Sequence, residues 1–171
     1  TEANMKTYAQ YFKKFIEAYD AEGIEIYMVS PQNEPTMNTP YSSCVWTGEQ
    51  LRGFIRDYLG PEMQKLGVQI YLGTFTNSDD SRVAPTLTDN DTRKYISGIT
   101  YQWWSYNKAR SLYHTGFNQG MMQSETMCGD GNNNWQYAEY QFDEMYMYFT
   151  NGISAYTMWN MVLEWDGENP G

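Results

Sequence analysis

The hydrophobic and polar positions of this chain alternate between helix-like and strand-like patterns from one end to the other. Residues 5–19 repeat apolar side chains every three or four positions, with Lys and Glu between them, so they predict an amphipathic helix that Gly23 ends. The apolar run 24–29 predicts a strand. Pro31 and Pro35 end that strand, because proline lacks a backbone donor.

The same alternation continues through the rest of the chain. Further helices are expected over 47–59, followed by one more turn over 61–67, and over 88–95, 108–113 and 135–150. Further strands are expected over 68–72, 98–104, 120–124 and 153–158. Strict alternation favours parallel βα units joined by right-handed crossovers. Five strands without a glycine-rich nucleotide-binding fingerprint favour an α/β fold that is part of a (β/α)8 barrel, with an open sheet as the alternative.

Local signals sharpen several of these elements. Thr47, followed three residues later by Gln50, fits a capping box. Asn134 is expected to cap the last helix, which Asn151 and Gly152 end and whose predicted apolar face contains Ala138, Phe142, Met145 and Phe149. Residues 77–91 are polar and rich in turn formers, which predicts an irregular connection before the helix 88–95.

Composition narrows the class of ligand. A chain of 171 residues can build one domain with a core, but a complete (β/α)8 barrel typically takes about 250 residues. The net charge of −10 argues against nucleic acid or anionic membranes as partners. No membrane span or signal peptide is recognisable. The 16 Tyr and 6 Trp suit a neutral, hydroxyl-rich ligand with apolar faces, such as a sugar.

Two glutamates follow predicted strands and are the central candidates for chemistry. Glu34 comes directly after Asn33 where the first strand gives way to a loop, and Glu125 ends the run 120–124. The carboxyl ends of barrel strands carry the active site. Glycoside hydrolysis needs one carboxyl to protonate the leaving oxygen and a second to attack the sugar or activate water. The alternative is that both are ordinary exposed glutamates on loops.

Three stretches of the chain resemble glycoside hydrolase family 30. They are PQNEP from Pro31 to Pro35, Ser124-Glu125 shortly before CGDG at 128–131, and WNMVL at 159–163. The resemblance runs over nearly the whole chain, with the motifs in the expected order. Within the family, YQW at 101–103 and CGDGNNNW at 128–135 most resemble the endo-β-1,6-glucanase subfamily. Glucosylceramidase-like and xylanase members more often have His at the position of Gln102.

The resemblance implies a mechanism and assigns roles. It implies a retaining β-glycosidase on a (β/α)8 barrel with a side β-domain. Glu34, at the end of the fourth strand, would be the general acid/base, and Glu125, at the end of the seventh, the nucleophile. Asn33 would hydrogen-bond the sugar 2-hydroxyl. Retention requires the two carboxyl groups to be about 5–5.5 Å apart. No metal or cofactor is expected.

Other side chains near strand ends are candidates for binding the sugar. Trp159 is expected to form the floor of the site, and Tyr101, Gln102 and Trp103 to line it, although a place in the core is the alternative for both tryptophans. Trp46 and Trp135 lie on loops, where they could be outer stacking platforms or simply pack on the surface.

The two cysteines offer a possible link. Cys44 and Cys128 both follow candidate catalytic strands, so a disulfide between them is expected, with two free thiols as the alternative.

Matched to the family, this chain corresponds to strands four to eight of the barrel. The first three strands, the last helix and the side β-domain have no counterpart in it. We therefore expect residues 1–171 to be the C-terminal part of a catalytic domain that needs the remainder of its own barrel, with the isolated piece poorly stable and nearly inactive. The substrate is expected to be an extracellular polysaccharide or oligosaccharide, which implies secretion. A carbohydrate-binding remnant without catalysis is the alternative function.

Overall fold

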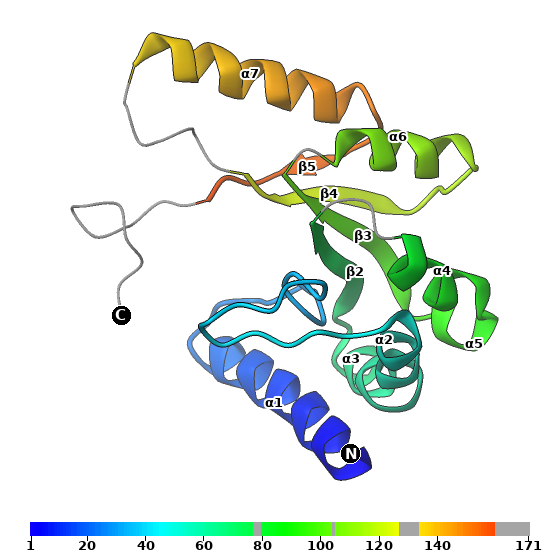
Figure 1. The fold of residues 1–171 in the computed structure, drawn as a ribbon. Helices are drawn as coiled ribbons and strands as arrows, with labels where there is room; N and C mark the ends of the chain where they lie inside the picture. Colours follow the sequence, from blue (N-terminus) through cyan, green and yellow to red (C-terminus); the bar gives the residue numbers. More distant parts are fainter. Residues whose placement is uncertain (77–79, 104, 127–133, 160–171) are drawn as a thin grey trace. The chain divides into compact units, whose positions relative to one another are not determined.

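The computed structural model describes residues 1–76, 80–103, 105–126 and 134–159, in which helices and strands alternate (Figure 1). The helices are α1 Glu2–Ala21, α2 Gly48–Phe54, the π-helical segment η1 Ile55–Leu59, α3 Gly60–Leu66, α4 Asp80–Thr88, α5 Asn90–Arg93, α6 Tyr106–His114 and α7 Trp135–Phe149. The strands are β1 Met28–Val29, β2 Gln69–Thr76, β3 Ile96–Gln102, β4 Gly120–Glu125 and β5 Ala155–Tyr156.

The five strands confirm the predicted partial (β/α)8 barrel. Their order in the sheet follows the chain, β1-β2-β3-β4-β5. The pairings β1–β2 and β4–β5 are parallel, with Met28 opposite Gln69 and Met122 opposite Ala155. Among the described residues, one compact unit comprises 1–75 and 80–100, and the other comprises Thr76 and the residues from Tyr101 onward, so that β2 and β3 each contribute to both.

The first unit is built around one long helical stretch. α2, η1 and α3 follow each other without a break, and their apolar side chains recur at helical spacing with at most 1% exposure at Leu51, Phe54, Ile55, Leu59 and Met63. Each such burial contributes about 1.5–3 kcal/mol. The predicted capping box is present, since Gln50 N donates to Thr47 Oγ1 at 3.2 Å and Thr47 N donates to Gln50 Oε1 at 2.8 Å.

One segment expected to be irregular is a helix. α4 covers part of the polar stretch 77–91, and it packs against α2. The contact is close because a Cβ on Gly48 would lie 2.5 Å from the carbonyl oxygen of Ser81 and 2.7 Å from Pro85 Cγ. Val83 and Thr86 are buried. Tertiary packing therefore overrides the turn-forming composition, which is why the sequence prediction was wrong here.

The strands also depart from their predicted lengths. β1 covers only the last two residues of the predicted run 24–29, and Ile24 and Tyr27 are more than half exposed. β1 has a neighbour on one side only in the sheet order, so no described strand pairs with its other edge. β5 is likewise shorter than the predicted run 153–158. β2 is longer than predicted, and Thr74 lies inside it rather than beyond its end.

In the second unit, α6 and α7 lie on the same side of β4 and β5 (Figure 1). The buried face of α7 is polar and consists of Gln141, Glu144 and Tyr148. The face predicted from apolar spacing is wrong: Phe142 is 69% exposed, and Ala138 and Phe149 are also exposed.

Polar partners explain which face of α7 is buried. Thr126 Oγ1 donates to Glu144 Oε2 at 2.8 Å, Gln141 Nε2 donates to the Tyr156 hydroxyl, and Ser105 N donates to the Tyr148 hydroxyl at 3.0 Å. Buried polar groups that have hydrogen-bond partners can replace an apolar face, and here each of the three side chains has at least one, while Gln141 Oε1 has none among the described residues.

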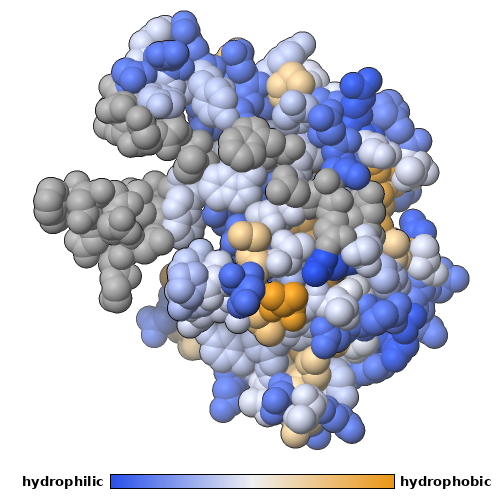
Figure 2. Space-filling model, in the orientation of Figure 1, coloured by the Kyte–Doolittle hydropathy of each residue, from blue (hydrophilic) through white to orange (hydrophobic). Residues whose placement is uncertain are grey.

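The face of the molecule in Figure 2 is mostly hydrophilic, with isolated apolar side chains, as the net charge of −10 leads one to expect. Within the described residues, no helix is both long enough and apolar enough to cross a membrane.

We predict opposite effects for two glycine-to-alanine changes in the long helical stretch of the first unit. A Cβ on Gly60 would lie 2.5 Å from the Tyr95 ring and 2.6 Å from the carbonyl oxygen of Ile55, so Gly60→Ala should destabilise by about 1–3 kcal/mol. Gly53 has nothing within 4 Å of the added atom, so Gly53→Ala should stabilise by about 0.5–1 kcal/mol. Urea unfolding followed by circular dichroism measures both, and a Gly60→Ala variant as stable as Gly53→Ala would contradict the packing.

Candidate active site

The first candidate group, Asn33 and Glu34, is held against β2 by backbone hydrogen bonds. Pairing between the two segments continues past the end of β1: Gln32 N donates to Gly73 O at 3.3 Å, and Thr74 N donates to Gln32 O at 2.7 Å. Glu34 N then donates to Thr74 O at 3.0 Å. The residues after β1 are therefore anchored to the neighbouring strand.

The backbone of Glu34 has an uncommon conformation. Its φ is 45°, and only Trp103, with φ 49°, shares a positive φ among the non-glycine residues that the structure describes. Such a conformation costs about 1–3 kcal/mol and persists where the surroundings fix it, typically at functional sites. Both residues were candidates from the sequence. The Glu34 side chain is half-buried, and Asn33 is exposed.

Thr74 connects the two side chains of this group. Its hydroxyl donates to Asn33 Oδ1 at 2.7 Å and also lies 3.4 Å from the backbone N–H of Glu34. This role could not be recognised in the sequence, because Thr74 is one of several polar residues after the predicted strand 68–72. Knowledge of the β1–β2 register could have identified it: Thr74 and Asn33 lie 41 positions apart, the same offset as the paired Met28 and Gln69.

The second candidate group surrounds Glu125 at the end of β4. Gln102 Nε2 donates to Glu125 Oε2 at 2.9 Å. The main-chain oxygen of Glu125 accepts hydrogen bonds from Trp103 N at 3.0 Å and from Gln123 Nε2 at 2.5 Å. Glu125 itself is half-buried, and Gln102 has 0% exposure. Hydrogen bonds to a charged partner are about twice as strong as neutral ones, so this carboxylate is held firmly.

The other predicted binding residues of the second unit differ in exposure. Tyr101 is 3% exposed, and its carbonyl accepts from the Ser124 hydroxyl at 3.2 Å. Trp103 is half-buried, and Trp159 is 43% exposed. The two tryptophans thus keep surface for a ligand, whereas Tyr101 is part of the core.

Buried hydroxyls support the strand end that bears Glu125. The hydroxyl of the next residue, Thr126, donates to Glu144 Oε2, and the main-chain oxygen of Thr126 accepts from Trp159 N at 2.5 Å. Burial raises the pKa of Tyr156 to about 12 and also raises the pKa of Tyr148. Both phenols therefore stay protonated at neutral pH, and they can keep hydrogen-bonding as neutral groups.

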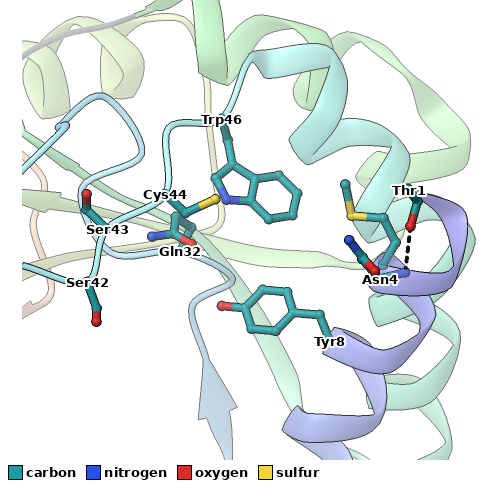
Figure 3. Close-up of a pocket in the computed structure, with 9 residues that line it drawn as sticks. Thr1, Asn4, Tyr8, Gln32, Ser42, Ser43, Cys44 and Trp46 are labelled. Atoms are coloured by element: carbon teal, nitrogen blue, oxygen red, sulfur yellow. Dashed lines mark hydrogen bonds between the residues drawn. The ribbon is translucent and has the colours of Figure 1, made fainter.

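A cavity of about 490 Å³ lies in the first unit between the start of α1 and the loop before α2 (Figure 3). Gln32, two residues before Glu34, lines it together with Thr1, Asn4, Met5, Tyr8, Ser42, Ser43, Cys44 and Trp46. Burial is the main cause that raises the pKa of Tyr8, whose hydroxyl donates to the carbonyl oxygen of Pro31 at 3.2 Å.

The two tryptophans that were expected on loops, Trp46 and Trp135, differ in their exposure. Trp46 is only 6% exposed and packs against Phe54 with ring centroids 5.3 Å apart, so it is not an outer stacking platform. Trp135 is 77% exposed, and its indole N–H donates to Glu139 Oε1 at 2.8 Å. It remains a candidate platform.

The expected disulfide does not appear at Cys44, which is a free, exposed cysteine. Cys128 lies outside the described residues, as do the motif at 128–131 and residues 160–163 of the last motif. Among the residues that the structure describes, no three His, Cys, Asp or Glu side chains are grouped so that they could hold a metal ion.

Comparisons with known proteins give a consistent family. The model of the "Glycosyl hydrolase family 30 TIM-barrel domain" matches residues 1–170. Putative glucosylceramidase 4 of Caenorhabditis elegans is 28% identical over 182 residues, which cover 95% of this chain and 35% of that protein. Endo-1,6-beta-D-glucanase neg1 of Aspergillus fumigatus is 25% identical over 125 residues, which cover 71% of this chain and 25% of the relative.

The fold of the chain is also similar to that of a solved structure. The endo-beta1,6-glucanase BT3312 matches with a TM-score of 0.84 and 25% identity, over 99% of this chain and 41% of that protein. The chain therefore spans well under half the length of each of these three proteins.

We predict that Cys44 reacts with iodoacetamide in the native protein without reductant, because its thiol is free and exposed. Mass spectrometry of tryptic peptides measures the modification, and a Cys44→Ser variant, which should take up one label fewer, is the control. Recovery of the Cys44 peptide covalently linked to the Cys128 peptide would contradict the structure and restore the disulfide hypothesis.

Proposed function

This chain belongs to glycosyl hydrolase family 30, and from that premise we propose that it hydrolyses β-glucosidic bonds with retention of configuration at the anomeric carbon. The observation that carries the proposal is the hydrogen bond from Gln102 Nε2 to Glu125 Oε2. It fixes a half-buried carboxylate at a strand end, where a barrel enzyme keeps its reacting groups. The positive φ of Glu34, the other candidate carboxylate, supports the same interpretation.

The proposed reaction has two displacements. In the first, a Glu125 oxygen attacks the anomeric carbon and the glycosidic C–O bond breaks, while the Glu34 carboxylic acid gives its proton to the leaving oxygen. In the second, the Glu34 carboxylate takes a proton from water as the water oxygen attacks the anomeric carbon. The ester to Glu125 breaks, and both glutamates return to their starting states.

The surrounding residues are proposed to bind and orient the sugar. Asn33 donates to the 2-hydroxyl, and the partly exposed rings of Trp103 and Trp159 contact apolar sugar faces. Gln102 is fully buried and bonded to Glu125, so its main role is to hold the nucleophile rather than to touch the substrate. Tyr101, also buried, supports the strand end.

The proposed substrate is a β-1,6-linked glucan cleaved within the chain. The names of two relatives support this choice, since one is an endo-1,6-beta-D-glucanase and the solved structure is an endo-beta1,6-glucanase. Glucosylceramide is the competing substrate, because another relative is named a putative glucosylceramidase. A glucan substrate outside the cell would require secretion, which we propose as part of the same function. Hydrolysis of β-1,6-glucan, glucosylceramide and glucuronoxylan, compared side by side, distinguishes the candidates.

We predict that a fluorinated β-glucoside, incubated with the full-length protein, forms a covalent adduct on Glu125. The fluorine slows breakdown of the glycosyl-enzyme intermediate, so the ester should accumulate and appear by intact-mass analysis and peptide mapping. Glu125→Gln should abolish both the adduct and turnover. The alternative has a different outcome. If the wild-type protein neither forms the adduct nor hydrolyses glucan, and the Glu125→Gln variant still binds glucan, the protein is a carbohydrate-binding protein rather than an enzyme.

We predict that Gln102→Met lowers kcat/KM about 10- to 100-fold, because a hydrogen bond to a charged group is worth about 1.5–3 kcal/mol. Gln102→His keeps an N–H donor and should retain more activity than Gln102→Met. Gln69→Met, at an exposed position at the start of β2, is the control for the amide-to-thioether change. Equal activity of Gln102→Met and wild type would show that this hydrogen bond does not support the reaction.

A further inference from the structure

Thr74 lies where the side chain of one strand can organise the residues that follow another. It is the sixth residue of β2, half-buried, and directly across from Asn33 in the extended β1–β2 register. Its carbonyl oxygen accepts the Glu34 N–H at 3.0 Å, and its hydroxyl donates to Asn33 Oδ1 at 2.7 Å. One threonine thus contacts the backbone of the general acid/base and the side chain of the residue before it.

The direction of these hydrogen bonds determines how the Asn33 amide is turned. A threonine hydroxyl has one proton to donate, and here that proton points to Asn33 Oδ1. The same oxygen presents a lone pair to the Glu34 N–H at 3.4 Å, so its donor and acceptor sides have different partners. With Oδ1 held at Thr74, the Nδ2 amide group of Asn33 is turned away from β2. A flipped amide would turn Nδ2 toward Thr74, and the hydroxyl would then have to give up its donation to Oδ1 and accept from Nδ2 instead.

Fixing this amide matters because Asn33 is exposed and its side chain has two rotatable bonds. An asparagine that samples both amide orientations would offer the sugar either a donor or an acceptor. A donor that is already oriented loses no entropy and needs no rearrangement when the reaction begins. The short distance to the Thr74 hydroxyl supplies that orientation.

We propose that Thr74 is a positioning residue that fixes the Asn33 amide with Nδ2 available to the sugar 2-hydroxyl, an inference that rests on the function proposed above. Thr74 does not touch the reacting atoms; it acts through Asn33. The competing explanation is that Thr74 is present only because a β-branched residue suits a strand. In that case valine, which has the same shape without the hydroxyl, would serve equally well.

The test is a double-mutant cycle between Thr74 and Asn33 in the full-length protein. The variants are Thr74→Val, Thr74→Ser, Asn33→Ala and the combination Asn33→Ala with Thr74→Val. The substrates are 4-nitrophenyl β-gentiobioside and its analogue that lacks the 2-hydroxyl on the reacting glucose. Thr86→Val is the matched control, because it removes a buried hydroxyl with no hydrogen-bond partner from α4.

We expect Thr74→Val to lower kcat/KM about tenfold on the substrate that has its 2-hydroxyl. A loss of this size corresponds to about one hydrogen bond. Thr74→Ser should restore most of the activity, and Thr86→Val should leave it unchanged. In the Asn33→Ala background, and on the 2-deoxy substrate, Thr74→Val should have no further effect. The pH at which activity falls on the basic side should stay the same, because the Glu34 carboxyl is not the group being positioned.

Two results would overturn the inference while leaving the proposed function in place. One is a double variant whose loss of kcat/KM equals the product of the losses in Thr74→Val and Asn33→Ala, which would mean that Thr74 and Asn33 act independently. The other is a shift of the basic side of the pH profile in Thr74→Val, which would mean that Thr74 acts on Glu34. A wild-type protein that hydrolyses no β-glucoside would instead overturn the proposed function, and this inference with it.

Discussion

The arrangement of both candidate groups depends on hydrogen bonds that continue past the ends of parallel strands. Glu34 takes its uncommon backbone conformation while its N–H is bound by Thr74 on β2. The main-chain oxygen of Glu125 is bound by the N–H of Trp103, the residue just after β3. A loop is rigid enough for chemistry only if its polar backbone atoms have partners. Here the neighbouring strand provides them.

Next to the end of β4, buried polar contacts hold α7 in place, a role that apolar packing usually has in a protein core. The buried face of α7 meets Thr126 through Glu144, and the hydroxyl of Tyr148 accepts a hydrogen bond from the backbone of Ser105. A buried polar network specifies one arrangement strictly, because any shift leaves a group unsatisfied in a medium of low dielectric constant. The strand that ends in Glu125 is therefore fixed in position by direction-dependent bonds as well as by packing.

The sequence predicted the features that depend on local pattern. The alternation of helices and strands, the capping box at Thr47 and the position of Glu125 at a strand end were all recognisable. It failed where tertiary contacts decide. α4 forms in a turn-rich stretch because Gly48 allows a close approach, and α7 turns a polar face inward because its partners lie on other elements. Thr74 could not be linked to Asn33 without the register of two strands.

The side chains that the structure shows donating to Glu125 and to Asn33 are amides and a hydroxyl, which do not titrate near neutral pH. The side chains of Gln102 and Gln123 both donate to Glu125, to its carboxylate and its main chain respectively, and Thr74 donates to Asn33. Amides and hydroxyls keep their charge across the physiological range, whereas a histidine at the Gln102 position would titrate within it. A carboxylate held by an amide keeps the same hydrogen bond at every pH at which it is ionised. The hydrogen bond from Gln102 to Glu125 therefore does not depend on a titrating donor.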